Sequence, residues 1–209
     1  MRPIGRLIEL VGQRWLRWRI GRARRRGGHD RALALLRDEL YGDFTRPMAL
    51  LYLEMAADLL ALGRADEALA ALRFADDAKL DSGLRRDKRL VAARALAEAG
   101  RVSEAEARLA EIDAGALDAA QRRRRDAASL EIAIARKDWA AVARDAGAGT
   151  ECWRRLALGA EALRRGGIDT AREHLEAAAR AAEGDPEAAL ARRQAEGLIE
   201  RALKQKARS

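Results

Sequence analysis

Apolar residues return at intervals of three and four along nearly the whole chain, which is the spacing of one face of an α-helix. Alternation of apolar and polar residues, the pattern of a half-buried strand, forms no run anywhere in the sequence. The pattern therefore predicts an all-α fold. The expected helices cover residues 4–26, 29–41, 47–62, 66–79, 84–99, 103–112, 116–136, 138–146, 150–165, 168–183 and 186–206.

A motif, Gly-x-x-Asp/Ser-x-Ala-x-x-x-Leu, recurs at the expected turns. It begins at Gly27, Gly63, Gly100 and Gly166, which are 36, 37 and 66 residues apart, and a worn copy begins at Lys137. The spacing of 66 is two units of 33, so the copies indicate an internal repeat. The aligned positions are Asp30, Ala32 and Leu36; Asp66, Ala68 and Leu72; Ser103, Ala105 and Leu109; Asp169, Ala171 and Leu175; and, in the worn copy, Asp138, Trp139, Val142 and Ala146.

Each position of the motif has a physical role. The glycine ends one helix in a left-handed conformation that other residues adopt at a cost. The Asp or Ser is expected to cap the next helix, and Ser103 with Glu106 forms a potential capping box. The alanine allows two helices to approach closely, and the leucine four residues later shares its face and fills the core.

Helical hairpins that recur about every 34 residues, with these turn and small residues, resemble the tetratricopeptide repeat (TPR). The resemblance covers residues 15–183 as about five units, and residues 184–209 follow as a capping helix with a basic tail. It implies a right-handed α-solenoid. The small residues of the first helices are then Ala56, Ala93 and Gly159, whereas the family's aromatic is replaced by Leu59, Leu96, Ala133 or Ala162 and its closing proline is absent.

The resemblance also implies a function, because the concave face of such arrays binds peptides or helices of other proteins. The chain is then a non-enzymatic adaptor or scaffold with an unknown protein partner. The expected partner-binding residues are Leu53, Asp87, Arg94, Arg124, Glu131 and Trp153. An alternative stays open for the apolar ones, since leucines and tryptophans at these positions also suit contacts between neighbouring helices.

Catalytic chemistry finds no support in the sequence. The two histidines, His29 and His174, have no second ligand at metal spacing, and neither a P-loop nor a nucleophile elbow occurs. The single cysteine, Cys152, lies in a helical pattern and suits a buried position in a reducing compartment. We therefore expect no enzyme activity, no metal and no cofactor.

The net positive charge is confined to one end of the chain. Residues 1–28 contain nine arginines and one acid, Glu9, so they carry the whole net charge of +8, and the other residues balance to zero. On a helix, one stripe about 100° wide contains only apolar residues up to Trp18, whereas most arginines fall outside it. The stripe residues are Ile4, Leu7, Ile8, Val11, Trp15 and Trp18.

Three interpretations of this basic helix, residues 1–26, remain open. It is the first helix of the array, with its stripe packed on Leu33, Leu36 and Leu40; or it lies on an anionic membrane surface; or, as the least favoured choice, it binds nucleic acid. An anionic surface would contact Arg14, Trp15, Arg17, Trp18, Arg24, Arg25 and Arg26. The sequence contains no apolar run of transmembrane length and no secretory signal pattern, so it favours a cytoplasmic protein. In the second interpretation the protein is peripheral at the inner face of the membrane. The arginine-rich composition is typical of bacteria.

Overall fold

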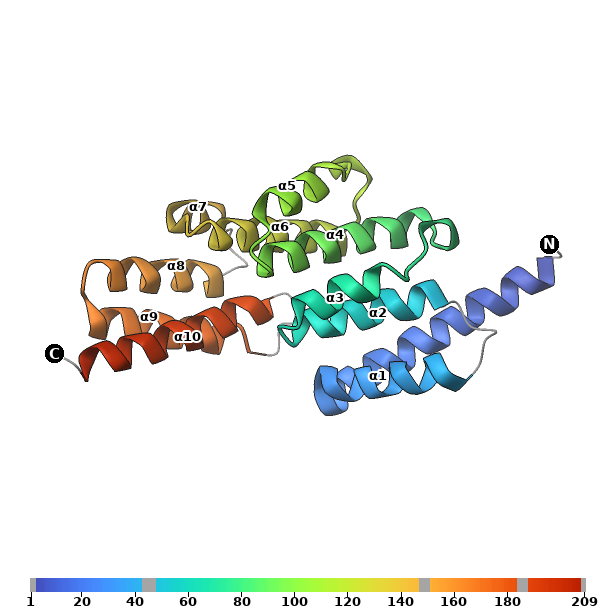
Figure 1. Cartoon of the computed structure of the whole chain (residues 1–209), viewed down its shortest axis with the longest axis horizontal. Coiled ribbons are helices and arrows are strands. Elements are labelled where there is room, and N and C mark those ends of the chain that lie inside the picture. The colour runs from blue at the N-terminus through green and yellow to red at the C-terminus, as the bar shows by residue number, and fades with distance from the viewer. Residues whose placement is uncertain (1–2, 43–47, 147–150, 184–187, 208–209) are drawn as a thin grey trace.

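The computed structural model describes residues 3–42, 48–146, 151–183 and 188–207, and in these residues the chain forms helices and no strands (Figure 1). The prediction of an all-α fold is confirmed. The α-helices are α1 (Pro3–Gly42), α2 (Met48–Ala61), α3 (Ala65–Leu72), α4 (Ser82–Glu98), α5 (Val102–Ala110), α6 (Ala119–Ala135), α7 (Trp139–Asp145), α8 (Glu151–Arg164), α9 (Ile168–Ala181) and α10 (Ala189–Lys206), and short 3-10 helices cover Asp77–Lys79 and Ala114–Ala116.

Helices that follow one another in the chain pack against each other. Residue contacts join α1 to α2, α2 to α3, α4 to α5, α7 to α8 and α8 to α9, and α10 packs on both α9 and α8. The helices α4 and α6, which are separated by α5, also lie against each other. The result is an elongated molecule whose two termini lie at opposite ends (Figure 1).

One turn geometry recurs at the predicted turn positions. Gly63, Gly100 and Gly166 have φ of 77°, 76° and 80°, and Lys137 of the worn copy has φ of 60°. Each turn has the two backbone bonds of a Schellman motif. At the first of them, the Gly63 amide donates to the Leu60 carbonyl at 2.9 Å and the next amide, of Arg64, donates to the Leu59 carbonyl at 2.9 Å. The same pair of bonds is formed at Gly100, Lys137 and Gly166.

The first copy of the motif is displaced by one residue. Gly28, with φ of 71° and ψ of −169°, divides α1 into two helices, whereas the sequence motif had placed the turn at Gly27. Both residues are glycine, so the motif could not distinguish them.

The predicted N-caps of α3, α5 and α9 are wrong, whereas Asp138 of the worn copy does cap α7 with its side chain. The helices α3, α5 and α9 begin at Ala65, Val102 and Ile168, so Asp66, Ser103 and Asp169 lie inside the first turn. The caps are Arg64, Arg101 and Gly167, and none of them caps with a side chain. The Schellman turn is the reason, because the residue after its left-handed position is already the cap of the next helix. The acids of the first turn still favour the helix dipole there.

Two helices also have bounds that differ from the expectation, and at each place an aspartate caps the start of a helix. The Asp118 side chain accepts a bond from the Gln121 amide and forms a capping box, so α6 begins at Ala119 rather than at residue 116. Asp76 accepts from the Ala78 amide and has extended φ and ψ, so the expected helix over 66–79 ends at Leu72 and resumes only as a 3-10 turn. The expected cap Asp185 and the following Pro186 lie outside the described residues.

The left-handed turns yield a prediction. Lys137→Gly is expected to raise the free energy of unfolding by about 1 kcal/mol, because a side chain at positive φ is strained and glycine is not. Gly100→Ala is the matched opposite: a methyl group there meets no atom within 4 Å, so it is expected to lower stability through the backbone alone, by about 1 kcal/mol. Urea denaturation of both variants measures the two shifts. A loss of stability in Lys137→Gly would contradict the turn geometry.

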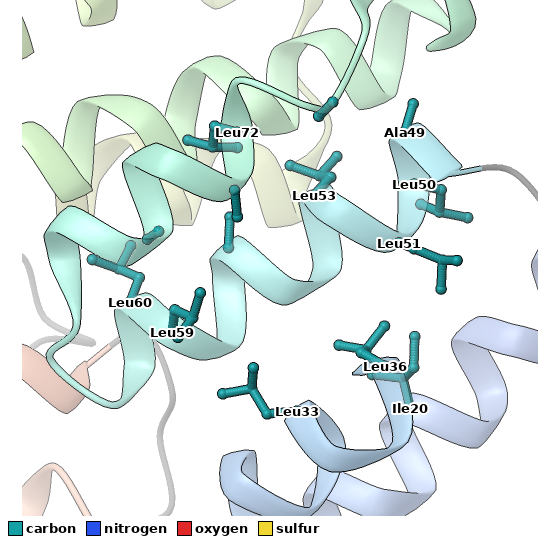
Figure 2. Close-up of a cluster of buried hydrophobic side chains, with 14 of the residues drawn as sticks. Ile20, Leu33, Leu36, Ala49, Leu50, Leu51, Leu53, Leu59, Leu60 and Leu72 are labelled. Carbon is teal, nitrogen blue, oxygen red and sulfur yellow. The ribbon is translucent and has the colours of Figure 1, made fainter. Parts of the chain in front are cut away.

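The small position is buried in all five copies of the sequence motif. Ala32, Ala68, Ala105 and Ala171 are fully buried, and so is Val142 at the same position of the worn copy. A large cluster of leucines joins α1, α2 and α3, with Ile20, Leu33 and Leu36 facing Leu51 and Leu59 (Figure 2). A second large cluster contains residues of all the helices from α6 through α10. Two smaller clusters are built around Leu96 and Leu90 of α4 and residues of the segments that follow it.

The first helix packs through an unexpected face. Ile20 lies in the core, fully buried beside Leu33 and Leu36, whereas Trp15 and Trp18 are 47% and 53% exposed. The interpretation in which the tryptophan stripe packs on the following helix is therefore wrong, although Leu33 and Leu36 do receive α1. Among the described helices, none combines the length and the hydropathy that a membrane crossing requires.

Candidate functional site

A groove of about 960 Å³ runs along the inner side of the helices. One wall consists of α1, α2, α4 and α6, and the other consists of the end of α9 and the start of α10. Helix α8 contributes no residue to the lining.

Five of the six expected partner-binding residues line this groove. They are Leu53, Asp87, Arg94, Arg124 and Glu131. Leu53 is only 3% exposed, so it contributes mainly to the core below the groove. The assignment of Trp153 is corrected: it is 2% exposed and lies in the cluster that joins α6 to α10, because its ring fills the space between α8 and its neighbours.

Ion pairs join α1 to α2 and α4 to α6 over separations of 34 or 37 residues. Arg17 and Arg24 of α1 bind carboxylates of α2 that lie 37 and 34 residues later. Residues of α4 bind residues of α6 in the same way, 37 residues later. The pairs are Arg17–Glu54, Arg24–Asp58, Asp87–Arg124 and Arg94–Glu131. We call this set the ion-pair ladder; it means that most groove charges are neutralised within the chain.

Arg24 is the centre of the ladder at the α1 end. Its guanidinium donates to both carboxylate oxygens of Asp58 at 2.7 and 2.9 Å and to Glu54 at 3.0 Å. Asp58 is fully buried and is also bonded to His29, whose Nδ1 lies 2.5 Å from Oδ1. Burial lowers the pKa of Arg24, but the bonds and charges of the two carboxylates outweigh it, so the net shift is upward. The guanidinium therefore stays charged, as the buried carboxylate requires.

The pair Arg94–Glu131 is the most deeply buried step of the ladder. The Arg94 Nε lies 3.0 and 3.1 Å from the two Glu131 oxygens and Nη2 lies 2.7 Å from one of them. The Glu131 side chain is 2% exposed and that of Arg94 is 11% exposed. Such a forked contact both fixes the geometry and compensates each charge for its loss of water.

The next step of the ladder is also braced. Asp87 accepts bonds from Arg124 at 2.9 Å and from the Gln121 amide at 3.0 Å. Gln121 belongs to the capping box at the start of α6, where the bond from its backbone amide is the largest cause that lowers the pKa of Asp118. The start of α6 is therefore tied to α4 through one polar cluster.

Arg193 of α10 joins the two walls of the groove, and the sequence reading had not selected it. Its Nη1 donates to the Ala61 carbonyl at 2.6 Å and its Nη2 lies 2.6 Å from Glu98 of α4. The Ala61 carbonyl is one of the unsatisfied groups at the C-terminus of α2, where a cation is favoured by the helix dipole. The contact spans 132 residues of the chain, so no local pattern could have indicated it.

The residues expected to contact an anionic surface divide between two sides of α1. Arg17 and Arg24 both bind carboxylates of this chain. The Arg24 side chain is 29% exposed, which corrects its assignment as a surface contact, whereas the Arg17 side chain is 48% exposed. Trp15, Trp18 and Arg25 are exposed. The side chains of Arg14 and Arg26 lie outside what the structure describes.

The described residues hold no group of three or more His, Cys, Asp or Glu side chains placed to bind a metal ion. His174 of α9 lies 3.4 Å from an Arg155 nitrogen, and Cys152 is buried. Of the four consecutive arginines of α6, Arg124 alone takes part in the ladder, whereas Arg122 and Arg123 are exposed as expected of a solvated face.

Searches with this chain against protein-family models, curated proteins and solved structures found no match.

Proposed function

We propose that this chain is a TPR-like array of about five helical hairpins with a capping helix, and that it acts as a non-enzymatic adaptor. One observation carries the proposal: a groove lined by successive first helices that are linked at a spacing of one repeat. Four Schellman turns and the buried small residue of each unit support the repeat.

The groove suits an extended peptide segment of a partner protein. The surface between the ion pairs is apolar, with Ala57, Val91 and Leu190 among its lining residues. Because the ladder already pairs most groove charges, a partner gains little from opposite charge and more from burial of apolar side chains. We therefore expect binding that changes little with salt.

Blocking the groove tests this function. Ala57→Trp is expected to weaken a peptide selected on the full-length protein from a random phage-displayed library by about tenfold or more, since the ring occupies the groove. Ala70→Trp, an equal change at an exposed position of α3 in the same hairpin, is the control and is expected to bind normally. Titration of the selected peptide by fluorescence anisotropy measures both. Peptides that bind both variants equally, or a library from which none is selected, would overturn the proposal.

We also propose that the adaptor works in the cytoplasm at the inner face of a membrane. The buried free thiol of Cys152 supports a reducing compartment. The exposed tryptophans of the basic helix support the membrane surface.

A further inference from the structure

The first part of α1, up to Gly28, has an inward side that holds it to the molecule. Ile20 is fully buried in the core beside Leu33 and Leu36. On the same side, Arg24 and Arg17 bind the carboxylates of α2. These contacts fix the rotation of the helix about its axis.

The opposite side of this helix carries two exposed tryptophans. Trp15 and Trp18 are 47% and 53% exposed, and Trp18 lies about 200° around the helix from Ile20. The guanidinium of Arg19 lies 4.7 Å from the Trp15 ring and that of Arg22 lies 5.3 Å from the Trp18 ring. Both rings are therefore available to a partner and are already associated with positive charge.

The character of this outward face changes along the axis. By the helical period, positions 4, 7, 8 and 11 share the face of the two tryptophans, and all four are Ile, Leu or Val. Beyond Trp18, position 22 continues the face and Arg22 is exposed. Arg25, at the next position of the same stripe, is exposed as well and lies at the border with the groove, which it also lines. The order along the face is thus aliphatic, then tryptophan, then arginine. The helix also extends past the ends of α2 and α4, at the right of Figure 1.

We propose that this outward face of α1 is a docking surface for an anionic lipid bilayer. The composition of the face suits a helix that lies in the membrane interface: aliphatic positions and tryptophans favour the boundary between headgroups and acyl chains, and arginines meet lipid phosphates. The charge is complementary, because residues 1–28 carry +8. Since the groove lies on the inward side of the same helix, docking leaves the groove open to the solvent. The inference rests on the membrane location proposed above and does not depend on what the groove binds.

Two other occupants fit the face less well. A second copy of the chain would bring two ends of +8 together, which is unfavourable without intervening anions. Nucleic acid would contact the arginines and stack on the rings, but its polar surface would not favour the four aliphatic positions of the same face. In addition, residues 29–209 carry no net charge, so they do not extend a phosphate-binding surface beyond this helix.

Vesicle binding by the full-length protein tests the proposal. Flotation with phosphatidylcholine vesicles that contain about 30 mol% phosphatidylglycerol is expected to recover the protein, whereas pure phosphatidylcholine vesicles are not, and binding is expected to fall as salt rises above about 0.15 M. Brominated acyl chains are expected to quench the fluorescence of Trp15 and Trp18, while Trp153 is buried and stays unaffected.

Two variants with matched controls locate the surface. Trp15→Ala/Trp18→Ala is expected to weaken binding to the anionic vesicles about tenfold or more, whereas Phe74→Ala, which removes a ring that is 64% exposed on another part of the surface, is expected to bind normally. Arg22→Glu is expected to weaken binding about tenfold, and Arg123→Glu on α6, with the same change of charge at an exposed position, much less. Circular dichroism at 222 nm verifies that each variant keeps its helices.

The outcomes are decisive in either direction. Loss of vesicle binding in both α1 variants, with retention in both controls, supports the docking surface. The proposal is overturned if the full-length protein does not float with anionic vesicles, or if it floats equally well without the two tryptophans. Two other results would also overturn it if vesicles do not bind. One is a dimer in sedimentation, and the other is an RNA complex in a gel shift at about 0.15 M salt, in each case lost when Trp15 and Trp18 are replaced. Peptide binding to the groove is measured separately, so failure of one proposal leaves the other unaffected.

Discussion

Glu131→Ala is expected to lower the free energy of unfolding by about 3–5 kcal/mol, one of the two largest effects that we predict. The variant leaves the guanidinium of Arg94, whose side chain is 11% exposed, without the carboxylate that it contacts through two of its nitrogens. An uncompensated charge at this depth is far less favourable than a missing pair, because water cannot replace the lost partner. Urea denaturation followed by circular dichroism measures the change.

Two comparisons separate burial from the mere presence of an ion pair. Glu104→Ala removes the partner of Arg101 from an exposed pair, in which the side chains are 58% and 48% exposed, and is expected to leave stability nearly unchanged because water solvates both charges. Arg94→Met/Glu131→Leu removes both buried charges and is expected to recover most of the stability lost in Glu131→Ala. Equal effects of Glu131→Ala and Glu104→Ala would contradict the buried geometry of the ladder.

Leu175→Ala is expected to lower the free energy of unfolding by about 2–5 kcal/mol, because this fully buried leucine of the motif fills the contact between α8 and α9. Gly159 of α8 lies directly opposite: a methyl group added there would come within 2.6 Å of the Leu175 Cγ. Gly159→Ala alone is therefore expected to destabilise the chain by about 1–3 kcal/mol through overpacking, which outweighs the gain of about 1 kcal/mol in helix propensity.

The two changes are expected to compensate each other. In Gly159→Ala/Leu175→Ala the new methyl group occupies part of the space that the leucine leaves, so the loss is smaller than the sum of the single losses by about 1 kcal/mol or more. Gly197→Ala in α10 is the control, since a methyl group there meets no atom within 4 Å, and it is expected to stabilise the helix by up to about 1 kcal/mol. Additive losses in the double variant would show that the two positions are not in contact.

The repeat was visible in the sequence because its key residues act locally. A glycine at the end of a helix and an alanine five residues later are needed for one turn and one close approach, and both are encoded within ten residues. The worn copy at Lys137 has the same turn without the glycine, because the two Schellman bonds are backbone bonds that any residue can make at the cost of some strain. The exact caps were missed for the same reason: the turn, rather than the Asp or Ser side chain, begins the next helix.

The candidate site was predictable only in part. The resemblance to TPR arrays implied that Asp87, Arg94, Arg124 and Glu131 share one face, and all four line the groove. It did not pair them, and it assigned Trp153 to that face, since an aromatic ring at the start of a helix is equally compatible with a core position. Asp58 and His29, which meet Arg24 in the groove, were not selected either. Their distinguishing property is burial, which arises only when α1 and α2 are in contact.

By itself the sequence determined the helices, the positions of most turns and the concentration of charge in residues 1–28. These features depend on periodicity and on backbone preferences, which operate over a few residues. Tertiary structure alone decided which side of α1 faces inward. The apolar stripe predicted one side, but the carboxylates of α2 hold Arg24 and Arg17, and the core takes Ile20, so the helix turns its tryptophans outward. A helix that can bury either of two faces is oriented by the neighbours available to it, and the carboxylates among these neighbours lie more than thirty residues away in the chain.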